Sequence, residues 1–195
     1  MAHVILASQS PRRKMLLEWA EIPFEVIVSD TDESYPETLA KHLVPEFIAL
    51  QKAKAVETMM TLDKSIQEDT CIIAADTIVL LKDQVLGKPK DEADAIDKLQ
   101  QLSGEKHEVI TGVVILYAGE MYSFSQTTLV RFHELSLEQI QFYVTKYKPY
   151  DKAGAYAIQE WVGVVGIESI EGDFYNVMGL PVSRVVQKIK QLGII

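Results

Sequence analysis

The chain has 195 residues, 48% of them hydrophobic and 24% charged, which suits one domain, or one domain with two lobes, around a sizeable core. The formal net charge of −9 argues against a general nucleic-acid binder, because such a protein needs a basic face. A single cysteine, Cys71, leaves no intrachain disulfide or cysteine-rich zinc site, and without a signal peptide or membrane-spanning stretch we expect a cytoplasmic protein that makes no membrane contact.

The first predicted element is a strand that turns sharply into a helix. The apolar run His3–Ala7 predicts a buried strand, and Ser10 and Pro11 are typical of the N-cap and the first position of a helix. Arg12 and Arg13 then fall in the first turn, where the helix dipole disfavours cations, so they favour an anion such as phosphate at this turn. The alternative is a helix start with exposed basic residues that bind nothing.

The next segment predicts a short strand, an acidic loop and a helix. Residues 24–28 alternate as in a strand, residues 29–37 form a polar loop that includes Glu33, and residues 38–60 predict a helix broken or kinked near Pro45. The acidic loop is either solvated or part of a metal or catalytic site. Lys52 and Lys54 are two positions apart and therefore point to different helix faces, so at most one of them faces a site. The alternative is that both are solvated.

The most apolar run, residues 71–81, lacks alternation and predicts a central strand buried on both faces. Asp76 interrupts it. A carboxylate there is costly unless it is paired, bound to metal or directed into a cleft. With Thr77 beside it, Asp76 is a candidate functional residue, and a structural ion pair is the alternative.

The second half of the chain alternates predicted strands and helices. After a strand at 84–86, Lys88 lies between Gly87 and Pro89 and is either a phosphate ligand or a surface lysine. Gln159, in a stretch of small residues, either reads a base edge through its amide or marks tight packing. We expect helices at 92–102, 136–147 and 182–192, one helical turn at 174–177, an antiparallel strand pair at 109–117 and 121–132, and a strand at 162–170.

Together these residues predict a site for a nucleotide triphosphate. The candidate cations are Arg12, Arg13 and Lys88, with Lys52 or Lys152, and the leading carboxylates are Asp76 and Glu33. Cations would neutralise phosphate charge, while carboxylates would hold a divalent ion or activate water. From composition and spacing alone, the prediction is a phosphate-handling α/β protein.

Several motifs, in order and spacing, resemble those of one known family, the Maf nucleoside triphosphate pyrophosphatases. They are Ser8-Gln9-Ser10-Pro11-Arg12-Arg13, Ala75-Asp76-Thr77-Ile78-Val79, Gly87-Lys88-Pro89, Leu102-Ser103-Gly104, Asp151-Lys152-Ala153-Gly154-Ala155-Tyr156 with Ile158-Gln159, and Met178-Gly179-Leu180-Pro181. The resemblance implies a single α/β domain over residues 1–195, with an elongated, mixed and twisted sheet flanked by helices. It also implies two lobes with a central cleft, as in the related inosine-triphosphate pyrophosphatases.

The same resemblance implies an activity. It implies hydrolysis of a nucleoside triphosphate to the monophosphate and pyrophosphate with Mg²⁺ or Mn²⁺. The implied role is removal of non-standard or excess nucleotides, with a link to inhibition of septum formation. The implied partner is a small-molecule nucleotide, with a possible homodimer. A nucleotide-binding regulator of cell division without turnover is an alternative.

Site residues carry over position by position. Asp76 matches the proton acceptor that activates water, and Glu33 matches an acidic residue that helps Asp76 hold metal. The phosphate-binding positions correspond to Arg13, Lys52 and Lys88, with Ser8 and Ser10 lining the same loop.

Substrate preference is implied by three further positions, Arg12, Thr77 and Gln159. The arginine at position 12 resembles the branch acting on dTTP and UTP, and 7-methyl-GTP is the alternative substrate. The chain departs from the family pattern at three positions where glycine is expected, and the last two flank Gln159. These are Ala74, Ala157 and Glu160.

Overall fold

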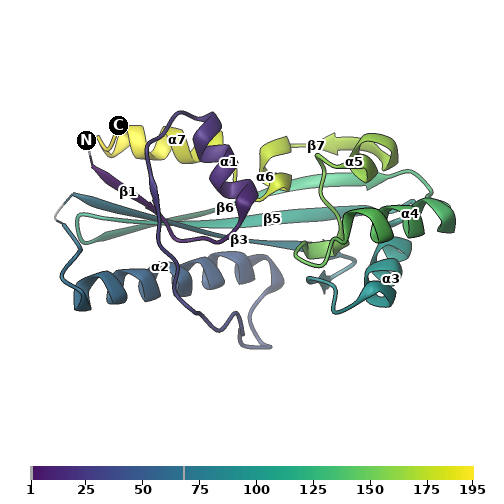
Figure 1. The fold of residues 1–195 in the computed structure, drawn as a ribbon, viewed down its shortest axis with the longest axis horizontal. Coiled ribbons are helices and arrows are strands. Elements are labelled where there is room, and N and C mark those ends of the chain that lie inside the picture. Colours follow the sequence, from purple (N-terminus) through teal and green to yellow (C-terminus); the bar gives the residue numbers. More distant parts are fainter. Residues whose placement is uncertain (1, 68) are drawn as a thin grey trace. The chain divides into compact units, whose positions relative to one another are not determined.

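The computed structural model describes residues 2–67 and 69–195, and within them the chain forms a mixed seven-stranded sheet flanked by helices (Figure 1). The strand order is β2-β1-β3-β5-β6-β7, and β4 pairs with β3. The strands are β1 (His3–Leu6), β2 (Glu25–Val26), β3 (Thr70–Leu81), β4 (Gln84–Leu86), β5 (Lys106–Tyr117), β6 (Glu120–Phe132) and β7 (Ile167–Glu171).

Seven α-helices and two 3₁₀ turns lie within the described residues. The α-helices are α1 (Pro11–Trp19), α2 (Val44–Leu62), α3 (Glu92–Leu102), α4 (Leu137–Tyr147), α5 (Trp161–Gly166), α6 (Phe174–Met178) and α7 (Val182–Gln191), and the 3₁₀ turns are η1 (Lys41–Leu43) and η2 (Ala153–Ala155). Among these described helices, none is long and apolar enough to cross a membrane.

The chain divides into two compact units. The first comprises Met1–Asp76, Thr111–Gln126 and Gly179–Ile195, and the second comprises Thr77–Ile110 and Thr127–Met178. The predicted single domain with two lobes and a cleft between them stays a prediction.

In the first unit, helix α2 packs on one face of the sheet. Strand β1 runs parallel to both β2 and β3, with Ile5 opposite Ile72. Helix α2 covers these strands through residues at helical spacing, including Ala49, Ala53 and Val56, which are all buried. The small alanine side chains let the helix approach the strands closely, and this contact fixes the position of the rest of α2.

The opposite face of the first unit is covered by α1 and α7 (Figure 1). Leu16 and Leu17 of α1 and Val185 and Ile189 of α7 are buried. Because β1 and the first half of β3 are covered on both faces, their apolar residues do not alternate with polar ones, and the apolar run of β3 is interrupted at Asp76 and Thr77. The prediction of a buried central strand at 71–81 is therefore confirmed, and Cys71 is buried in it, where burial raises the pKa of its thiol to about 12.

The core of the second unit contains an aromatic cluster. The ring of His107 stacks on Phe132, and its Nε2 lies 2.8 Å from the hydroxyl of Tyr156. Burial lowers the pKa of His107 to about 4 and raises that of Tyr156 above its usual value. His107 is therefore a neutral structural residue near pH 7.

Two predicted elements are wrong. The helix predicted over 38–60 is wrong at its start, because residues 41–43 form η1 and α2 begins only at Val44. Pro45 therefore stands in the first turn of α2, where a proline has no intrahelical N–H to lose. The predicted strand at 162–170 is instead α5 followed by β7, which begins at Ile167. The predicted second strand, 24–28, forms ladder pairing only at Glu25–Val26.

Candidate functional site

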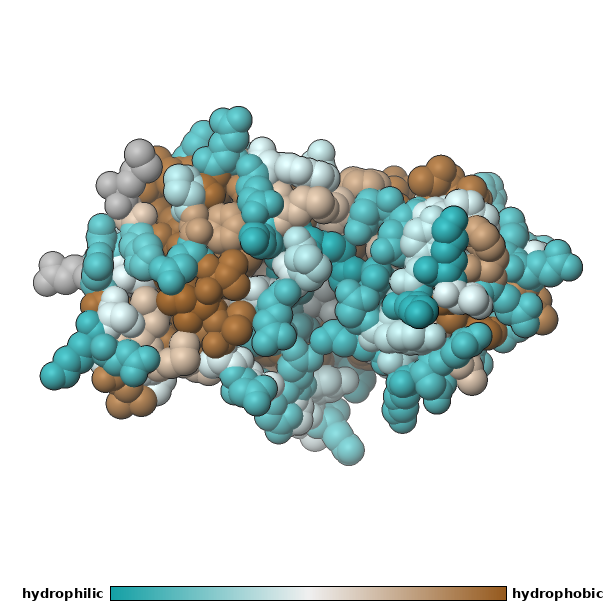
Figure 2. All heavy atoms as spheres, in the orientation of Figure 1, coloured by the Kyte–Doolittle hydropathy of each residue, from teal (hydrophilic) through white to brown (hydrophobic). Residues whose placement is uncertain are grey.

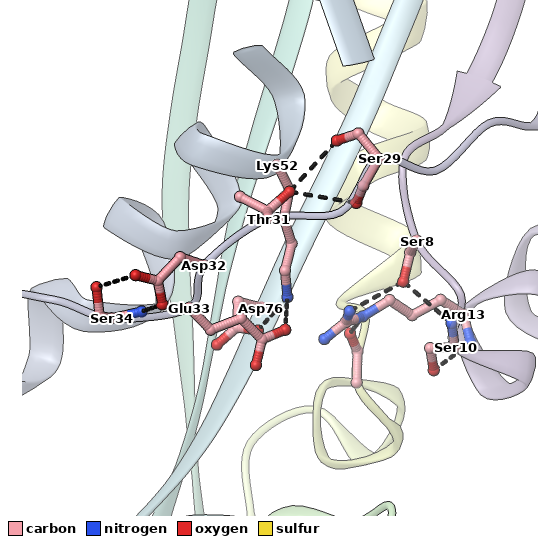
Figure 3. A network of polar contacts seen from close by, with 11 residues as sticks. Ser8, Ser10, Arg13, Ser29, Thr31, Asp32, Glu33, Ser34, Lys52 and Asp76 are labelled. Carbon is pink, nitrogen blue, oxygen red and sulfur yellow. Dashed lines mark hydrogen bonds and ion pairs between the residues drawn. The ribbon is translucent and has the colours of Figure 1, made fainter. Parts of the chain in front are cut away.

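Arg13 is built into the turn between β1 and α1. Ser10 is the N-cap of α1, and its hydroxyl accepts a hydrogen bond from the backbone N–H of Arg13 at 3.4 Å. The Arg13 side chain turns inward, with its Nη1 donating to Ser8 Oγ at 3.1 Å and its Nε donating to the carbonyl oxygen of Gly179 at 2.7 Å (Figure 3). Arg13 is only 8% exposed, so these contacts fix the direction of its guanidinium.

The field around Arg13 links it to the carboxylates of the same unit. Burial is the main cause that lowers the pKa of Arg13 from its ordinary value, while the negative charges of Asp76 and Glu33 act in the opposite direction. The neighbouring Arg12 lowers the pKa of Arg13 further, because two positive charges repel. The buried guanidinium therefore lies within electrostatic reach of both predicted acidic residues.

Lys52 joins Asp76 to Glu33 (Figure 3). Its Nζ lies 2.7 Å from Asp76 Oδ1 and 2.8 Å from Glu33 Oε1. The Lys52 side chain comes from α2 and the Asp76 side chain from β3, and they are 17% and 13% exposed. Asp76 is thus paired but not sealed from solvent, and its role as a functional residue stays a prediction.

Only one of the two lysines of α2 faces this site. Lys54, two residues after Lys52, lies at the surface with its Nζ 2.9 Å from Glu57 Oε2. The two lysines therefore point to different faces of α2, as predicted, and Lys52 is the one that contacts Asp76.

Glu33 comes from the loop that follows β2, and turn chemistry organises that loop next to it. The backbone N–H and the hydroxyl of Ser34 both donate to the carboxylate of Asp32, at 3.0 and 2.8 Å. These hydrogen bonds lower the pKa of Asp32. Hydrogen bonds of this kind are typical of an aspartate that stabilises a turn. The next helix or strand along the chain after this loop is η1.

Asp76 and Glu33 are two carboxylates that could contribute to binding a divalent cation, which would need further ligands. Mg²⁺ is usually bound through one or two carboxylates together with phosphate oxygens and water, rather than by a cage made only of protein ligands. Asp76 and Glu33 converge on one ammonium group, and they offer oxygen ligands suited to Mg²⁺ or Mn²⁺. Within the described residues no group of three or more His, Cys, Asp or Glu side chains could hold a metal, so phosphate oxygens would have to complete the coordination.

The remaining candidate residues divide between the units. Ser8, Ser10 and Arg12 lie with Arg13 in the first unit, whereas Thr77, Lys88 and Gln159 belong to the second. Lys88 and Gln159 are exposed, and Thr77 is half-buried in β3 beside Asp76. That these three side chains converge with Arg13 and Asp76 stays a prediction.

Two glycines that were not predicted as site residues help to position Arg13 and α2. Gly179 supplies the carbonyl that accepts from Arg13, at a positive φ of 118°. Gly112 lies under the start of α2, where an added Cβ would stand 2.2 Å from the backbone nitrogen of Glu46. A lone glycine inside the β-branched run of β5 is the sequence signal that could have revealed this close approach.

The fold and the charged cluster together indicate an α/β protein built to hold an anionic ligand. Residues 3–192 match the family model described as "Maf-like protein", which spans nearly the whole chain, and the chain belongs to the Maf family.

Curated relatives are similar over almost their full length. A dTTP/UTP pyrophosphatase from Parabacteroides distasonis is 47% identical over 188 residues, covering 96% of this chain and 94% of the relative. Proteins of the same name from Phocaeicola vulgatus and Porphyromonas gingivalis are 48% and 44% identical, and each alignment covers 97% of this chain and 95% or 94% of the relative. Among solved structures, the Staphylococcus aureus Ham1 protein has a TM-score of 0.45 at 13% identity, covering 68% of this chain and 72% of that one. The relation to inosine-triphosphate pyrophosphatases stays a prediction.

Proposed function

We propose that this protein hydrolyses dTTP and UTP to the nucleoside monophosphate and pyrophosphate. The observation that carries the proposal is the Lys52 ammonium between Asp76 and Glu33, within the field of the buried Arg13. The names of the curated relatives, with Arg12 at the position that resembles the pyrimidine branch, support these substrates.

In this proposal the cations hold the triphosphate. The Arg13 guanidinium is directed by Ser8 and Gly179, so its planar donors meet phosphate oxygens without first losing conformational freedom. Lys52 would exchange part of its carboxylate pairing for phosphate contact, and Lys88 would add a third cation. Ser8 and Ser10, on the same turn, supply hydroxyl groups beside Arg13.

Asp76 is the proposed general base. Its carboxylate accepts a proton from a water molecule as the water oxygen forms a bond to the α-phosphorus. The bond from that phosphorus to the oxygen bridging the α- and β-phosphates breaks, and pyrophosphate leaves. Lys52 donates a hydrogen bond to Asp76 Oδ1 and so orients the carboxylate until the water is in position.

Asp76 and Glu33 are the residues that would hold Mg²⁺ or Mn²⁺. When bound, a divalent cation acidifies water and neutralises phosphate charge. The acidified water matters for a base of this kind, because a free aspartate titrates at about pH 3.9 and deprotonates bulk water poorly. We expect hydrolysis to require the cation and to stop in excess chelator.

The decisive experiment measures pyrophosphate release from a panel of triphosphates with Mg²⁺ or Mn²⁺. The panel is dTTP, UTP, CTP, 5-methyl-UTP, pseudo-UTP and 7-methyl-GTP. Turnover of dTTP and UTP supports the proposal, whereas a preference for 7-methyl-GTP would move the chain to the other branch. Binding of triphosphates without any turnover would instead favour the regulator.

Two lysines on one helix provide a matched pair of variants. Lys52→Met removes the cation that joins the carboxylates, and we expect kcat/KM to fall about 10- to 100-fold, because a hydrogen bond to a charged group contributes roughly 1.5–3 kcal/mol. Lys54→Met removes a surface charge on the same helix and should leave the rate within twofold. Equal effects of the two substitutions would contradict the assignment of Lys52.

A further inference from the structure

Glu160 stands where the family pattern leads us to expect glycine, and its carboxylate is engaged on two sides. It accepts a hydrogen bond from the hydroxyl of Tyr143, which is fully buried in α4. Its Oε1 also lies 3.5 Å from Nζ of Lys152. Lys152 is 8% exposed, and its ammonium lies 2.7 Å from Asp151 Oδ1 as well. A glycine at position 160 would leave both Tyr143 and Lys152 without this carboxylate.

The same tyrosine hydroxyl holds the other end of a tight turn. It accepts a hydrogen bond from the backbone N–H of Ala157 at 3.2 Å. The N–H of Glu160 donates to the carbonyl of Ala157 at 3.1 Å, which closes a four-residue turn. Gln159 is the third residue of this turn and is exposed, while Ile158 before it is buried. One phenol oxygen therefore fixes both ends of the turn that presents Gln159.

Helix α5 restrains the turn from its other side. The carbonyl of Glu160 accepts from the backbone N–H groups of Gly163 at 2.9 Å and Val164 at 3.2 Å. A Cβ at Gly163 would stand 1.8 Å from the carbonyl oxygen of Ile158, so the helix packs directly on the turn backbone. Tyr143, Lys152 and α5 leave the backbone of Gln159 little freedom to move.

We propose that Glu160, acting with Tyr143, is a positioning residue that locks the Gln159 turn so that the Gln159 amide meets the pyrimidine base in one orientation. The inference rests on the proposed function, and it adds two residues that position a residue for substrate specificity. An amide that both donates and accepts distinguishes bases only if its direction is fixed, because a rotating amide pairs with either pattern. Loss of the lock should therefore weaken discrimination between bases and leave the chemistry at the phosphates unchanged.

The test compares initial rates on dTTP, UTP and CTP for wild type and four variants. Glu160→Gly removes the carboxylate, Glu160→Gln keeps an acceptor for Tyr143 but removes the charge that faces Lys152, and Tyr143→Phe removes the shared hydroxyl. Glu168→Gln, at an exposed carboxylate of β7, is the matched control. Thermal unfolding of each variant shows that it is folded at the assay temperature.

For Glu160→Gly we expect KM for dTTP and UTP to rise about tenfold with kcat within twofold, because a contact made equally in ground and transition states changes KM alone. The preference for these substrates over CTP should narrow by a similar factor. Tyr143→Phe should behave similarly, Glu160→Gln should lie between Glu160→Gly and wild type, and Glu168→Gln should match wild type.

Two results would overturn the inference. One is an unchanged substrate preference in folded Glu160→Gly and Glu160→Gln. The other is a parallel fall in kcat for all three nucleotides, which a purely structural role would give. A wild type that turns over no triphosphate overturns the proposed function instead, so the two failures are distinguishable.

Discussion

Gly112→Ala tests whether the contact of α2 with the sheet sets the position of Lys52. The new Cβ would stand 2.2 Å from Glu46 N, 2.4 Å from Pro45 C and 2.6 Å from Glu46 Cα, whereas ordinary contact begins at 3.4 Å. The start of α2 must therefore move by about 1 Å or the strand must bend. All three clashing atoms belong to backbone, so no side-chain rotation relieves them.

The expected cost follows from this clash. Overpacking of this kind costs about 1–3 kcal/mol, and in a chain of this length each kcal/mol lowers Tm by about 2–4 °C, so we expect Tm to fall by roughly 2–12 °C. Because Lys52 lies on the displaced helix, kcat/KM should also fall, and a misplacement of about 1 Å can cost up to about 100-fold.

Differential scanning fluorimetry and pyrophosphate release measure the two effects. Gly87→Ala is the stability control, because a Cβ there meets no atom within 4 Å among the described residues, and its Tm should stay within about 2 °C of wild type. If Gly112→Ala unfolds at the wild-type temperature and keeps the wild-type rate, the close contact does not position Lys52, and the reasoning is refuted.

Three further outcomes are expected. Asp76→Asn should lower kcat by about 10²- to 10⁴-fold, as loss of a general base does, while calorimetry finds UTP affinity within about threefold; near wild-type turnover would remove Asp76 from that role. Arg13→Lys should lower kcat/KM at least about tenfold, because an ammonium cannot reproduce the directed contacts to Ser8 and Gly179, and rates within twofold would argue against it. Stability should fall by about 3 kcal/mol as pH drops from about 6.5 to 4, because His107 is protonated in the unfolded chain over this range but has a folded-state pKa of about 4. Urea unfolding at pH 7 and 4.5 measures this loss of stability. The loss should be smaller in His107→Phe, and an equal loss in that variant would contradict the assignment of the pH dependence to His107.

Local signals were reliable wherever neighbouring residues decide the backbone. Ser10 and Pro11 begin α1 as predicted. The expected helices α3 and α4 also begin at side-chain caps, which Asp91 and Ser136 supply. The two-residue turn between β5 and β6 has positive φ at both positions, which joins them as a hairpin.

Predictions failed where packing at a distance overrides local preference. The β-branched residues of α5 favour a strand, yet Gly163 lets this segment pack as a helix on the backbone of Ile158. Pro45 was interpreted as a break because sequence spacing does not say where α2 begins.

For the site, the sequence alone determined which side chains are chemically able to bind phosphate or metal: two N-terminal arginines after a helix cap, and a carboxylate inside an apolar strand. Only the tertiary structure decided that Lys52 rather than Lys54 reaches Asp76, that Glu33 shares this ammonium, and that Gly179 holds Arg13 from 166 residues away. The physical reason is that the chemistry of each side chain follows from its residue type, which the sequence states directly. These contacts depend instead on how α2 and the sheet pack, which no local pattern encodes.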